Sequence, residues 1–313
     1  MKPVMNQGID RKRLSLFLGL AFGISWISAL VIYLTGGLVA SPELIPGTGI
    51  TLALVLLSSV YMWGPALAHI LTRIITKEGW EDAFLRPNFK KAWVYWLIGW
   101  FGPGLLTIAG AALFFILFPM NFDGSLDFVK NQLDAMGAAG EIFTPIQYAL
   151  MQAGIALLIS ALVNLVATFG EEFGWRGYLL PKLQPLGSVR SLLLSGVIWG
   201  VWHWPVIAMG HNYGLDYPGF PWLGMLATIW VMVSIGVFFG WLSMKAGSVW
   251  PAVLAHGALN GMAAIGLLFA KGELSMLVGP TPAGMVGCLP FTIISILILT
   301  SANKKGQQES IKD

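Results

Sequence analysis

Residues 142–176 read IFTPIQYALMQAGIALLISALVNLVATFGEEFGWR, and this stretch decides the class of fold. No Asp, Glu, Lys or Arg occurs from Ile142 to Gly170, and about 20 apolar residues are enough for a helix to cross a bilayer core. The run ends in the charged sequence Glu171-Glu172-Phe-Gly-Trp-Arg176. The whole chain is 56% hydrophobic and 11% charged, whereas soluble domains carry about 25% charged residues. Together these features predict an integral membrane protein.

Seven further apolar runs of similar length occur along the chain, and none of them contains an acidic or basic residue. Because backbone polar groups inside lipid must be satisfied within the segment, we expect helices rather than open strands. We therefore predict an all-α, polytopic bundle of about eight transmembrane helices. It forms a single domain over residues 14–302, between cytoplasmic segments 1–13 and 303–313. The predicted spans are Leu14–Gly36, Gly49–Thr72, Ala92–Met120, Ile142–Gly170, Ser191–Gly210, Trp222–Met244, Ser248–Ala270 and Ala283–Ala302.

The basic residues indicate how the chain lies in the membrane. If the N-terminus is cytoplasmic, 16 of the 18 Lys and Arg residues fall on the cytoplasmic side and only Lys130 and Lys271 fall outside. Cytoplasmic loops of membrane proteins carry such an excess of positive charge. We therefore predict a multi-pass protein of the cell membrane with both termini in the cytoplasm. The cytoplasmic set is Lys2, Arg11, Lys12, Arg13, Arg73, Lys77, Arg86, Lys90, Lys91, Arg176, Lys182, Arg190, Lys245, Lys304, Lys305 and Lys312.

The same charge pattern bears on partners. The basic residues form short clusters between apolar runs, whereas a nucleic-acid site needs a basic patch on a folded surface. We therefore expect membrane lipid as a partner and no nucleic acid. The single cysteine, Cys288, excludes a disulfide within the chain and is expected to be a packing residue. The oligomeric state is not readable from these features.

Ionisable residues in or beside membrane helices are costly and are functional candidates by default. Glu171 and Glu172 are adjacent, so their side chains point about 100° apart on a helix. Glu172 and Arg176 are four residues apart and share a face in the favourable acid-before-base order. We predict that Glu172 pairs with Arg176 and that Glu171 faces the other helices, where it acts as a general base on water. In the alternative interpretation, both acids lie at the interface in water.

Two histidines lie inside apolar runs, each with a partner four residues away on the same helical face. Trp199 shares a face with His203, and His256 shares a face with Asn260. Buried histidines need polar partners, so packing groups that satisfy their hydrogen bonds within the bundle are the alternative interpretation. We interpret the remaining histidines differently. We assign His69 to packing or the interface and His211 to an external loop.

Glu171, His203 and His256 together would form a ligand set of two histidines and one carboxylate, as in zinc hydrolases. Their spacing is not His-Glu-x-x-His, so nothing local establishes a metal, and zinc stays a possible cofactor only. Without a metal, Glu171 and His203 could hold and deprotonate a water molecule. His256 and Asn260 could then stabilise the oxyanion.

The three motifs resemble those of the CAAX-protease and bacteriocin-processing family of intramembrane proteases, which includes the type II CAAX prenyl endopeptidases. That family has Glu-Glu-x-x-x-Arg, then an aromatic residue four positions before a histidine, then His-x-x-x-Asn or a similar pair. The order and spacing match here over about residues 145–262, and Trp199 stands where the family more often has Phe. The matching motifs are Glu171-Glu172-Phe-Gly-Trp-Arg176, Trp199-Gly-Val-Trp-His203 and His256-Gly-Ala-Leu-Asn260.

The resemblance implies an eight-helix fold with an intramembrane cavity that opens toward the cytoplasm. It implies that Glu171 and His203 activate the hydrolytic water and that His256 stabilises the tetrahedral intermediate with Asn260. Glu172 and Arg176 would be supporting residues, with Trp199 beside them. The family's metal-dependent and metal-free glutamate mechanisms both stay open for these residues.

We therefore predict an endopeptidase that cuts a membrane-associated peptide or protein near the cytoplasmic face of the membrane, with or without prenylation of the substrate. A non-catalytic bacteriocin-immunity or binding protein on the same fold is one alternative. A transporter is another, although it would require paired broken helices in two related halves, and no repeat is visible in the sequence.

Two further expectations concern helix ends. His203 and His256 lie deep in their spans, so Glu171 can meet them only if its helix continues submerged or if the fifth helix starts below the membrane. We expect the former, with the helix continuing to about Leu180 and Pro181 ending it. Between residues 121 and 141, apolar side chains recur at helical spacing, which predicts a short amphipathic helix on the outer surface. A plain solvated loop is the alternative for that segment.

Overall fold

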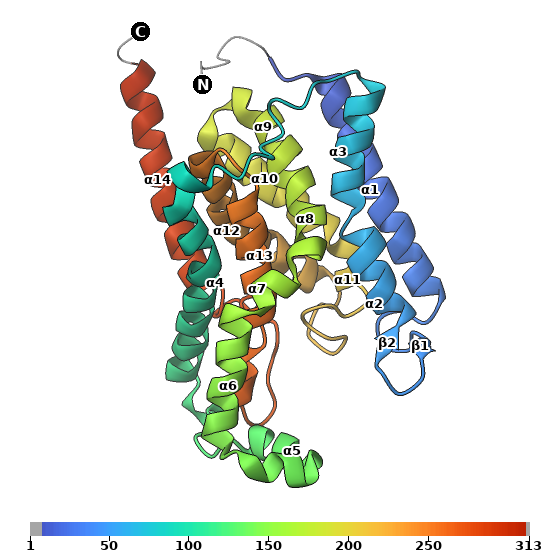
Figure 1. Cartoon of the computed structure of the whole chain (residues 1–313), viewed down its shortest axis with the longest axis vertical. Coiled ribbons are helices and arrows are strands. Elements are labelled where there is room, and N and C mark those ends of the chain that lie inside the picture. Colours follow the sequence, from blue (N-terminus) through green and yellow to red (C-terminus); the bar gives the residue numbers. More distant parts are fainter. Residues whose placement is uncertain (1–7, 311–313) are drawn as a thin grey trace.

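The computed structural model describes residues 8–310, which form a bundle of helices (Figure 1). Side chains of 138, 139 and 305–310 are outside this description. The helices are α1 (Arg11–Leu34), α2 (Leu52–Leu56), α3 (Gly64–Ile75), α4 (Phe89–Leu117), α5 (Asp127–Ala135), α6 (Pro145–Leu158), α7 (Ser160–Val163), α8 (Leu165–Gly174), α9 (Leu180–Leu183), α10 (Ser188–Trp202), α11 (Trp204–Ile207), α12 (Trp222–Ala246), α13 (Trp250–Met262) and α14 (Leu289–Ser310). The only strands in the described part are β1 (Glu43–Ile45) and β2 (Ile50–Thr51), an antiparallel pair after α1.

The predicted all-α membrane bundle is confirmed, although its eight apolar runs form helices of two kinds. Five helical stretches of the described chain are long and apolar enough to cross a membrane. They are Arg11–Leu34, Leu52–Ile75, Phe89–Leu117, Trp222–Ala246 and Trp250–Phe269. The other three runs contain the shorter apolar helices Pro145–Leu158, Ser188–Trp202 and Leu289–Lys304. Helix α14 continues as far as Ser310, beyond the predicted end at Ala302.

The fourth run is broken because its own polar side chains bind its backbone. The Oγ of Ser160 donates to the Ala156 carbonyl, and the Nδ2 of Asn164 donates to the Ser160 carbonyl 2.8 Å away. Such local bonds compete with the helical ladder. The segment therefore proceeds as α6, α7 and α8 rather than as one straight helix.

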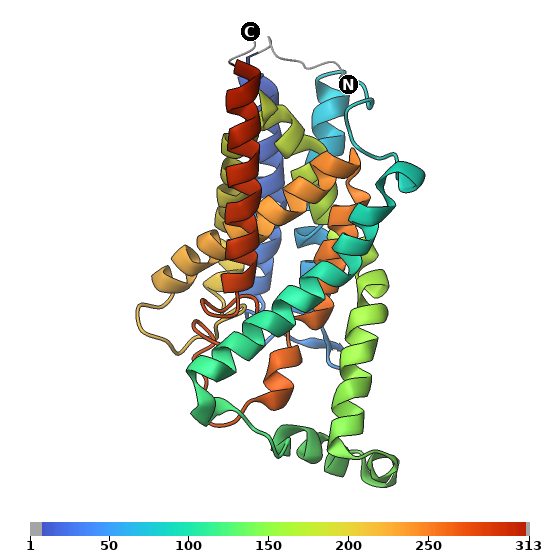
Figure 2. The same ribbon diagram turned by 90° about the vertical axis from the view of Figure 1, so that its left-hand side faces the viewer.

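Two views agree on where the chain ends lie. The start of α1 and the end of α14 are at the same end of the bundle, together with α9 (Figures 1 and 2). Helix α5 lies at the opposite end (Figure 1). The predicted even number of membrane crossings would place both chain ends at the same end of the bundle, and this arrangement agrees with that prediction.

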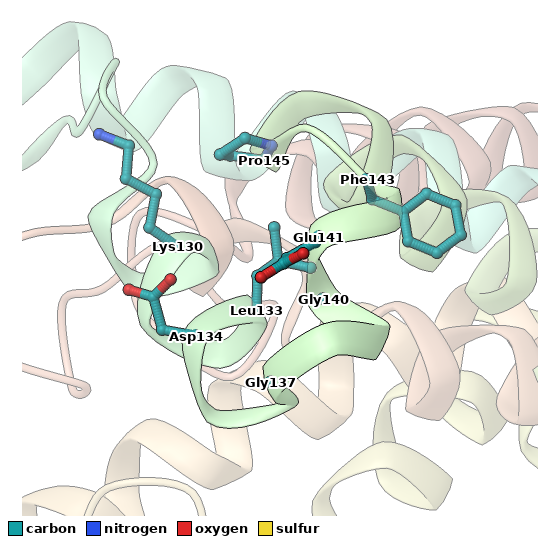
Figure 3. A pocket seen from close by; sticks show the side chains of 8 residues that line it. All are labelled: Lys130, Leu133, Asp134, Gly137, Gly140, Glu141, Phe143 and Pro145. Carbon is teal, nitrogen blue, oxygen red and sulfur yellow. The ribbon is translucent and has the colours of Figure 1, made fainter.

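The predicted amphipathic helix between residues 121 and 141 is present as α5. Its Val129 and Leu133 are buried against Ala149 of α6 and Met262 of α13, so the plain-loop alternative is wrong. Beside α5 lies a cavity of about 330 Å³, shown in Figure 3. Its lining is Lys130, Leu133, Asp134, Gly137, Gly140, Glu141, Phe143 and Pro145.

The centre of the bundle is built from α12 and α13. In the most apolar stretch of α12, 72% of the residues are buried, and in that of Trp250–Phe269, which contains α13, 67% are buried. The share is 33% in α1 and in α4. Helix α4 crosses α13 closely because Gly99 has no side chain: a Cβ there would overlap the Pro251 carbonyl oxygen. A backbone oxygen in a helix cannot move aside as a flexible side chain can. The crossing holds α13, and with it His256, in place.

We expect Gly99→Ala to destabilise the protein by about 1–3 kcal/mol, the usual cost of overpacking. The measurement is the midpoint of thermal unfolding in detergent. Gly154→Ala is the control, because a Cβ at Gly154 would meet nothing within 4 Å and alanine is the better helix former. Equal midpoints for the two variants would contradict this account of the crossing.

Candidate active site

The two motif glutamates lie inside the bundle, not in water. Glu171 is 3% exposed and Glu172 is fully buried, so the interpretation that both acids lie at the interface is wrong. Their helix, α8, continues through a π-helical segment, Trp175–Leu179, into α9. At 1.5 Å per residue, Glu171 then lies roughly 18 Å from the end of the helix.

The continuation agrees with the prediction from the sequence, but the predicted end of the helix is wrong. Pro181 does not end the helix, which continues to Leu183. Proline is tolerated in the first turn of a helix because the N–H groups there have no intrahelical partner. Pro181 occupies such a position, since α9 begins afresh at Leu180 after the π segment.

The carboxylate of Glu172 joins two helices. Its Oε1 accepts a hydrogen bond from Nη1 of Arg176 at 2.9 Å, which confirms the predicted pair. The same oxygen lies 2.9 Å from Nδ1 of His256 on α13, a contact that the sequence did not predict. The guanidinium of Arg176 also lies over the ring of Trp199, 4.3 Å from its centroid. An unpaired charge this deep would be strongly unfavourable, so the cluster fixes the distance between α8 and α13.

Glu171 points away from Glu172, as helical phase predicted, and meets α10. Its Oε2 accepts a hydrogen bond of 2.8 Å from the indole Nε1 of Trp199. Trp199 is fully buried, so the packing around the indole holds its N–H in one direction. One oxygen of Glu171 is therefore fixed, while the other, Oε1, has no hydrogen-bond partner among the described residues.

His203 and His256 flank the same indole. Their ring centroids lie 5.6 Å and 5.4 Å from that of Trp199. The Nδ1 of His203 lies 2.8 Å from the Trp199 carbonyl oxygen, and because a carbonyl only accepts, Nδ1 carries the proton. His203 thus presents Nε2 as an acceptor. The Nδ1 of His256 is bound to Glu172, so His256 also presents Nε2.

Asn260 lies one turn after His256 on α13 and is exposed at the protein surface. No hydrogen bond of its side chain occurs in the described part of the chain. The structure therefore brings Glu171, His203 and His256 around Trp199, while Asn260 shares only its helix with His256.

A zinc ion would suit the donor chemistry of Glu171, His203 and His256, but not their placement. Within residues 8–310, no three His, Cys, Asp or Glu side chains are grouped closely enough to hold one metal ion. The Nδ1 of His256 is bound to Glu172 and Oε2 of Glu171 is bound to Trp199, which leaves Nε2 of His256 and Oε1 of Glu171 for a ligand. Zinc therefore stays a prediction, and no step below passes through a metal.

We predicted from the sequence that His69 is a packing or interface residue, and this prediction did not include its contact with the first motif. His69 is fully buried on α3, and its Nδ1 lies 2.8 Å from the carbonyl oxygen of Phe173, inside the first motif. His69 and Phe173 are 104 residues apart, so no local pattern could have shown this bond. His211 lies in the connection between α11 and α12, which agrees with the predicted loop; that the loop is external stays a prediction.

Two buried carboxylates, the buried His256 and the half-buried His203 form a polar centre within the membrane bundle, and this centre defines the class of site. Comparison with known proteins shows a similarity over the part of the chain that carries this centre. Residues 152–262 match the model of the family described as "Type II CAAX prenyl endopeptidase Rce1-like", and these residues carry all three motifs.

A curated relative agrees with that match. The CAAX prenyl protease 2 of Methanococcus maripaludis is 26% identical over 234 residues, which cover 64% of this chain and 84% of the relative. The two matches confirm the resemblance drawn from the motifs. They support a CAAX-type intramembrane peptidase that acts on a membrane-associated peptide or protein.

We expect Glu172→Gln to destabilise the protein by about 3–5 kcal/mol, because it leaves the buried Arg176 without its ionised partner. The glutamine keeps the volume and can still accept a hydrogen bond, so the change isolates the charge. The midpoint of thermal unfolding in detergent measures the effect, and Glu141→Gln at an exposed acid should leave it unchanged. A Glu172→Gln protein as stable as wild type would show that the buried pair does not stabilise the fold.

Proposed function

We propose that this chain is an intramembrane endopeptidase that hydrolyses a peptide bond near the cytoplasmic membrane face. The observation that carries the proposal is the convergence of Glu171, His203 and His256 on Trp199, with both histidines presenting Nε2. The family match and the protease relative support the reaction class.

In the proposed reaction, a water molecule attacks the carbonyl carbon of the scissile bond. Glu171 takes the proton of that water on the oxygen that Trp199 does not hold. The Nε2 of His203, which accepts because its Nδ1–H is bound to the Trp199 carbonyl, orients the same water. Collapse of the tetrahedral intermediate transfers the proton from Glu171 to the leaving amine, so each proton is accounted for.

The oxyanion needs hydrogen-bond donors, and the proposal assigns them to α13. Asn260 can donate from its amide group. The Nδ1 of His256 faces the Glu172 carboxylate, which only accepts, so a donating Nε2 requires a proton on both ring nitrogens. Glu172 and Arg176 therefore support catalysis through His256 rather than by contact with substrate.

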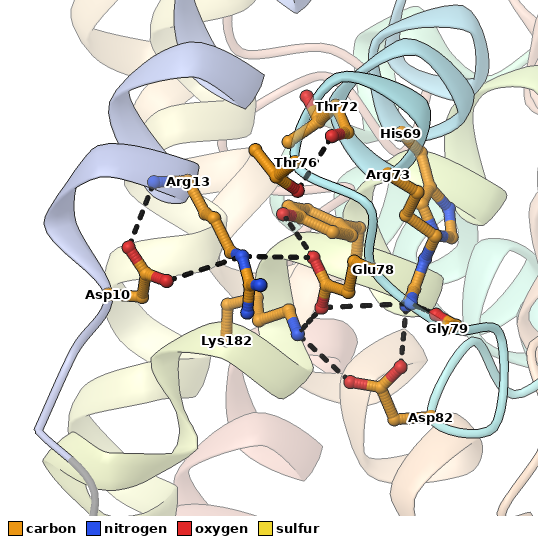
Figure 4. A network of polar contacts seen from close by, with 11 residues as sticks. Asp10, Arg13, His69, Thr72, Arg73, Thr76, Glu78, Gly79, Asp82 and Lys182 are labelled. Carbon is orange, nitrogen blue, oxygen red and sulfur yellow. Dashed lines mark hydrogen bonds and ion pairs between the residues drawn. The ribbon is translucent and has the colours of Figure 1, made fainter.

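The cytoplasmic face is proposed from charge. Basic residues gather at the end of the bundle that holds α9 and the start of α1, among them Arg13, Arg73 and Lys182 (Figure 4). Cytoplasmic ends of membrane proteins carry such an excess. The relative's name indicates a prenylated CAAX sequence as a first substrate to try, and an unprenylated membrane peptide as a second.

Glu171→Gln and His203→Gln should each abolish cleavage, because each removes a group that holds the attacking water. The assay uses purified protein in vesicles with two labelled peptides, an S-farnesylated CAAX sequence and its unprenylated form. Comparative proteomics of membrane peptides from wild-type and Glu171→Gln cells extends the assay to native substrates. Glu141→Gln is the matched control at an exposed acid.

If both active-site variants cleave as wild type does, the proposal that this site hydrolyses the peptide bond is wrong. Full biological activity without cleavage would favour the immunity or binding alternative. Elemental analysis of the same samples tests zinc: stoichiometric metal that is lost in the His203→Gln protein would replace the glutamate mechanism by a metal-dependent one.

Trp199→Phe should lower kcat by about tenfold, or about 1.4 kcal/mol, with KM nearly unchanged. It keeps an aromatic ring but removes the N–H that holds Glu171. Trp202→Phe is a matched control, because Trp202 is 1% exposed and its Nε1 has no hydrogen-bond partner in the described chain. Equal kcat values for the two variants would show that the indole N–H does not orient Glu171.

A further inference from the structure

A network of charged side chains surrounds Arg73 at the α9 end of the bundle (Figure 4). Arg73 is 1% exposed; its Nη2 donates to Oδ1 of Asp82 at 2.7 Å and its Nη1 donates to the Gly79 carbonyl. Lys182 of α9 lies 3.0 Å from the other oxygen of Asp82 and also binds Glu78. The connection between α3 and α4 therefore ties α3 to α9.

The ionisation of Asp82 fits this bridging role. Burial alone would raise the pKa of Asp82, but hydrogen bonds and charge from Lys182 and Arg73 lower it below its ordinary value. Asp82 is thus ionised at neutral pH and binds a cation on each oxygen. The Nε–H of Arg73 is a further donor, and it points toward α3 itself.

That donor fixes the state of His69. The Nε of Arg73 lies 2.6 Å from Nε2 of His69. A guanidinium only donates, so Nε2 accepts and the proton of the neutral imidazole lies on Nδ1. The Nδ1–H then donates to the carbonyl oxygen of Phe173, 2.8 Å away. Arg73 therefore sets the tautomer of His69 and aims it at the motif helix.

Phe173 follows Glu172 directly and stands just before the helix widens from α to π at Trp175. The helix lies close against α3 here: a Cβ on Gly170 would overlap the Met62 carbonyl oxygen, and one on Gly174 would overlap the backbone of Pro65. The glycines permit this close approach but do not fix the rotation of α8 about its axis. The hydrogen bond from His69 to Phe173 crosses the same interface, and because it is directional it restricts that rotation.

We propose that His69 is a positioning residue of the active site. Through the Phe173 carbonyl it sets the rotation of α8, and so places Glu171 against Trp199 and Glu172 against His256. The proposal rests on the proposed peptidase function, and it replaces the packing role predicted for His69. The chain of contacts runs from Lys182 and Asp82 through Arg73 and His69 to Phe173.

Three substitutions separate the two bonds of His69. Asparagine places an amide N–H two bonds beyond Cβ, where Nδ1 lies, and keeps the donor to Phe173. Glutamine reaches the position of Nε2 and keeps an acceptor for Arg73 but loses that donor. Phenylalanine fills the ring volume and makes neither bond.

In the peptide cleavage assay, we expect His69→Gln and His69→Phe to lower kcat by about 10- to 100-fold, the size of effect that a misplaced catalytic group produces, with little change in KM. His69→Asn should restore most of kcat. Hydrogen–deuterium exchange, which needs no substrate, should show faster exchange at residues 171–180 in the Gln and Phe variants than in the Asn variant.

Thr72→Val is the control for α3, because Thr72 is fully buried and its Oγ1 has no hydrogen-bond partner in the described chain. It should match wild type in kcat and exchange. The proposal is overturned if His69→Asn loses as much kcat as His69→Phe, or if all three variants exchange at residues 171–180 as wild type does. Cleavage that survives in Glu171→Gln would instead overturn the function on which the proposal rests.

Discussion

The structure depends on one buried carboxylate that serves two helices. Oε1 of Glu172 binds both Arg176 on its own helix and His256 on α13, and all three residues are at most 6% exposed. A charge in an apolar bundle must be paired where it lies. This requirement sets how α8 faces α13, and because adjacent residues diverge by about 100° on a helix, it also directs Glu171 toward α10.

Trp199 holds the remaining groups of the site in place. Its indole donates to Glu171, its ring covers Arg176, and its carbonyl fixes the tautomer of His203. One residue on α10 therefore organises the acid, the cation and the histidine. Phe at this position, which the resembling family more often has, would keep the ring contacts and the carbonyl but not the bond to Glu171.

The sequence predicted what short-range spacing controls. Apolar runs without charges marked the membrane helices, and a separation of four residues paired Glu172 with Arg176, because both depend on helical periodicity. It could not predict that Glu172 meets His256 or that His69 meets Phe173, since 84 and 104 residues separate these partners. The end of the motif helix at Leu183 was also missed. A π segment resets the helix before Pro181, and nothing in the local pattern marks it.

Composition names possible zinc donors but not how far apart the fold holds them. Within residues 8–310, no three His, Cys, Asp or Glu side chains are grouped closely enough for one metal ion. The α9 end adds a second, partly exposed layer of charge, where the side chain of Asp82 is 42% exposed. Exposed ion pairs contribute little to stability, yet this layer includes Arg73, which is 1% exposed and reaches inward to His69. A network at the bundle end is thereby joined, through one neutral histidine, to the backbone beside Glu172.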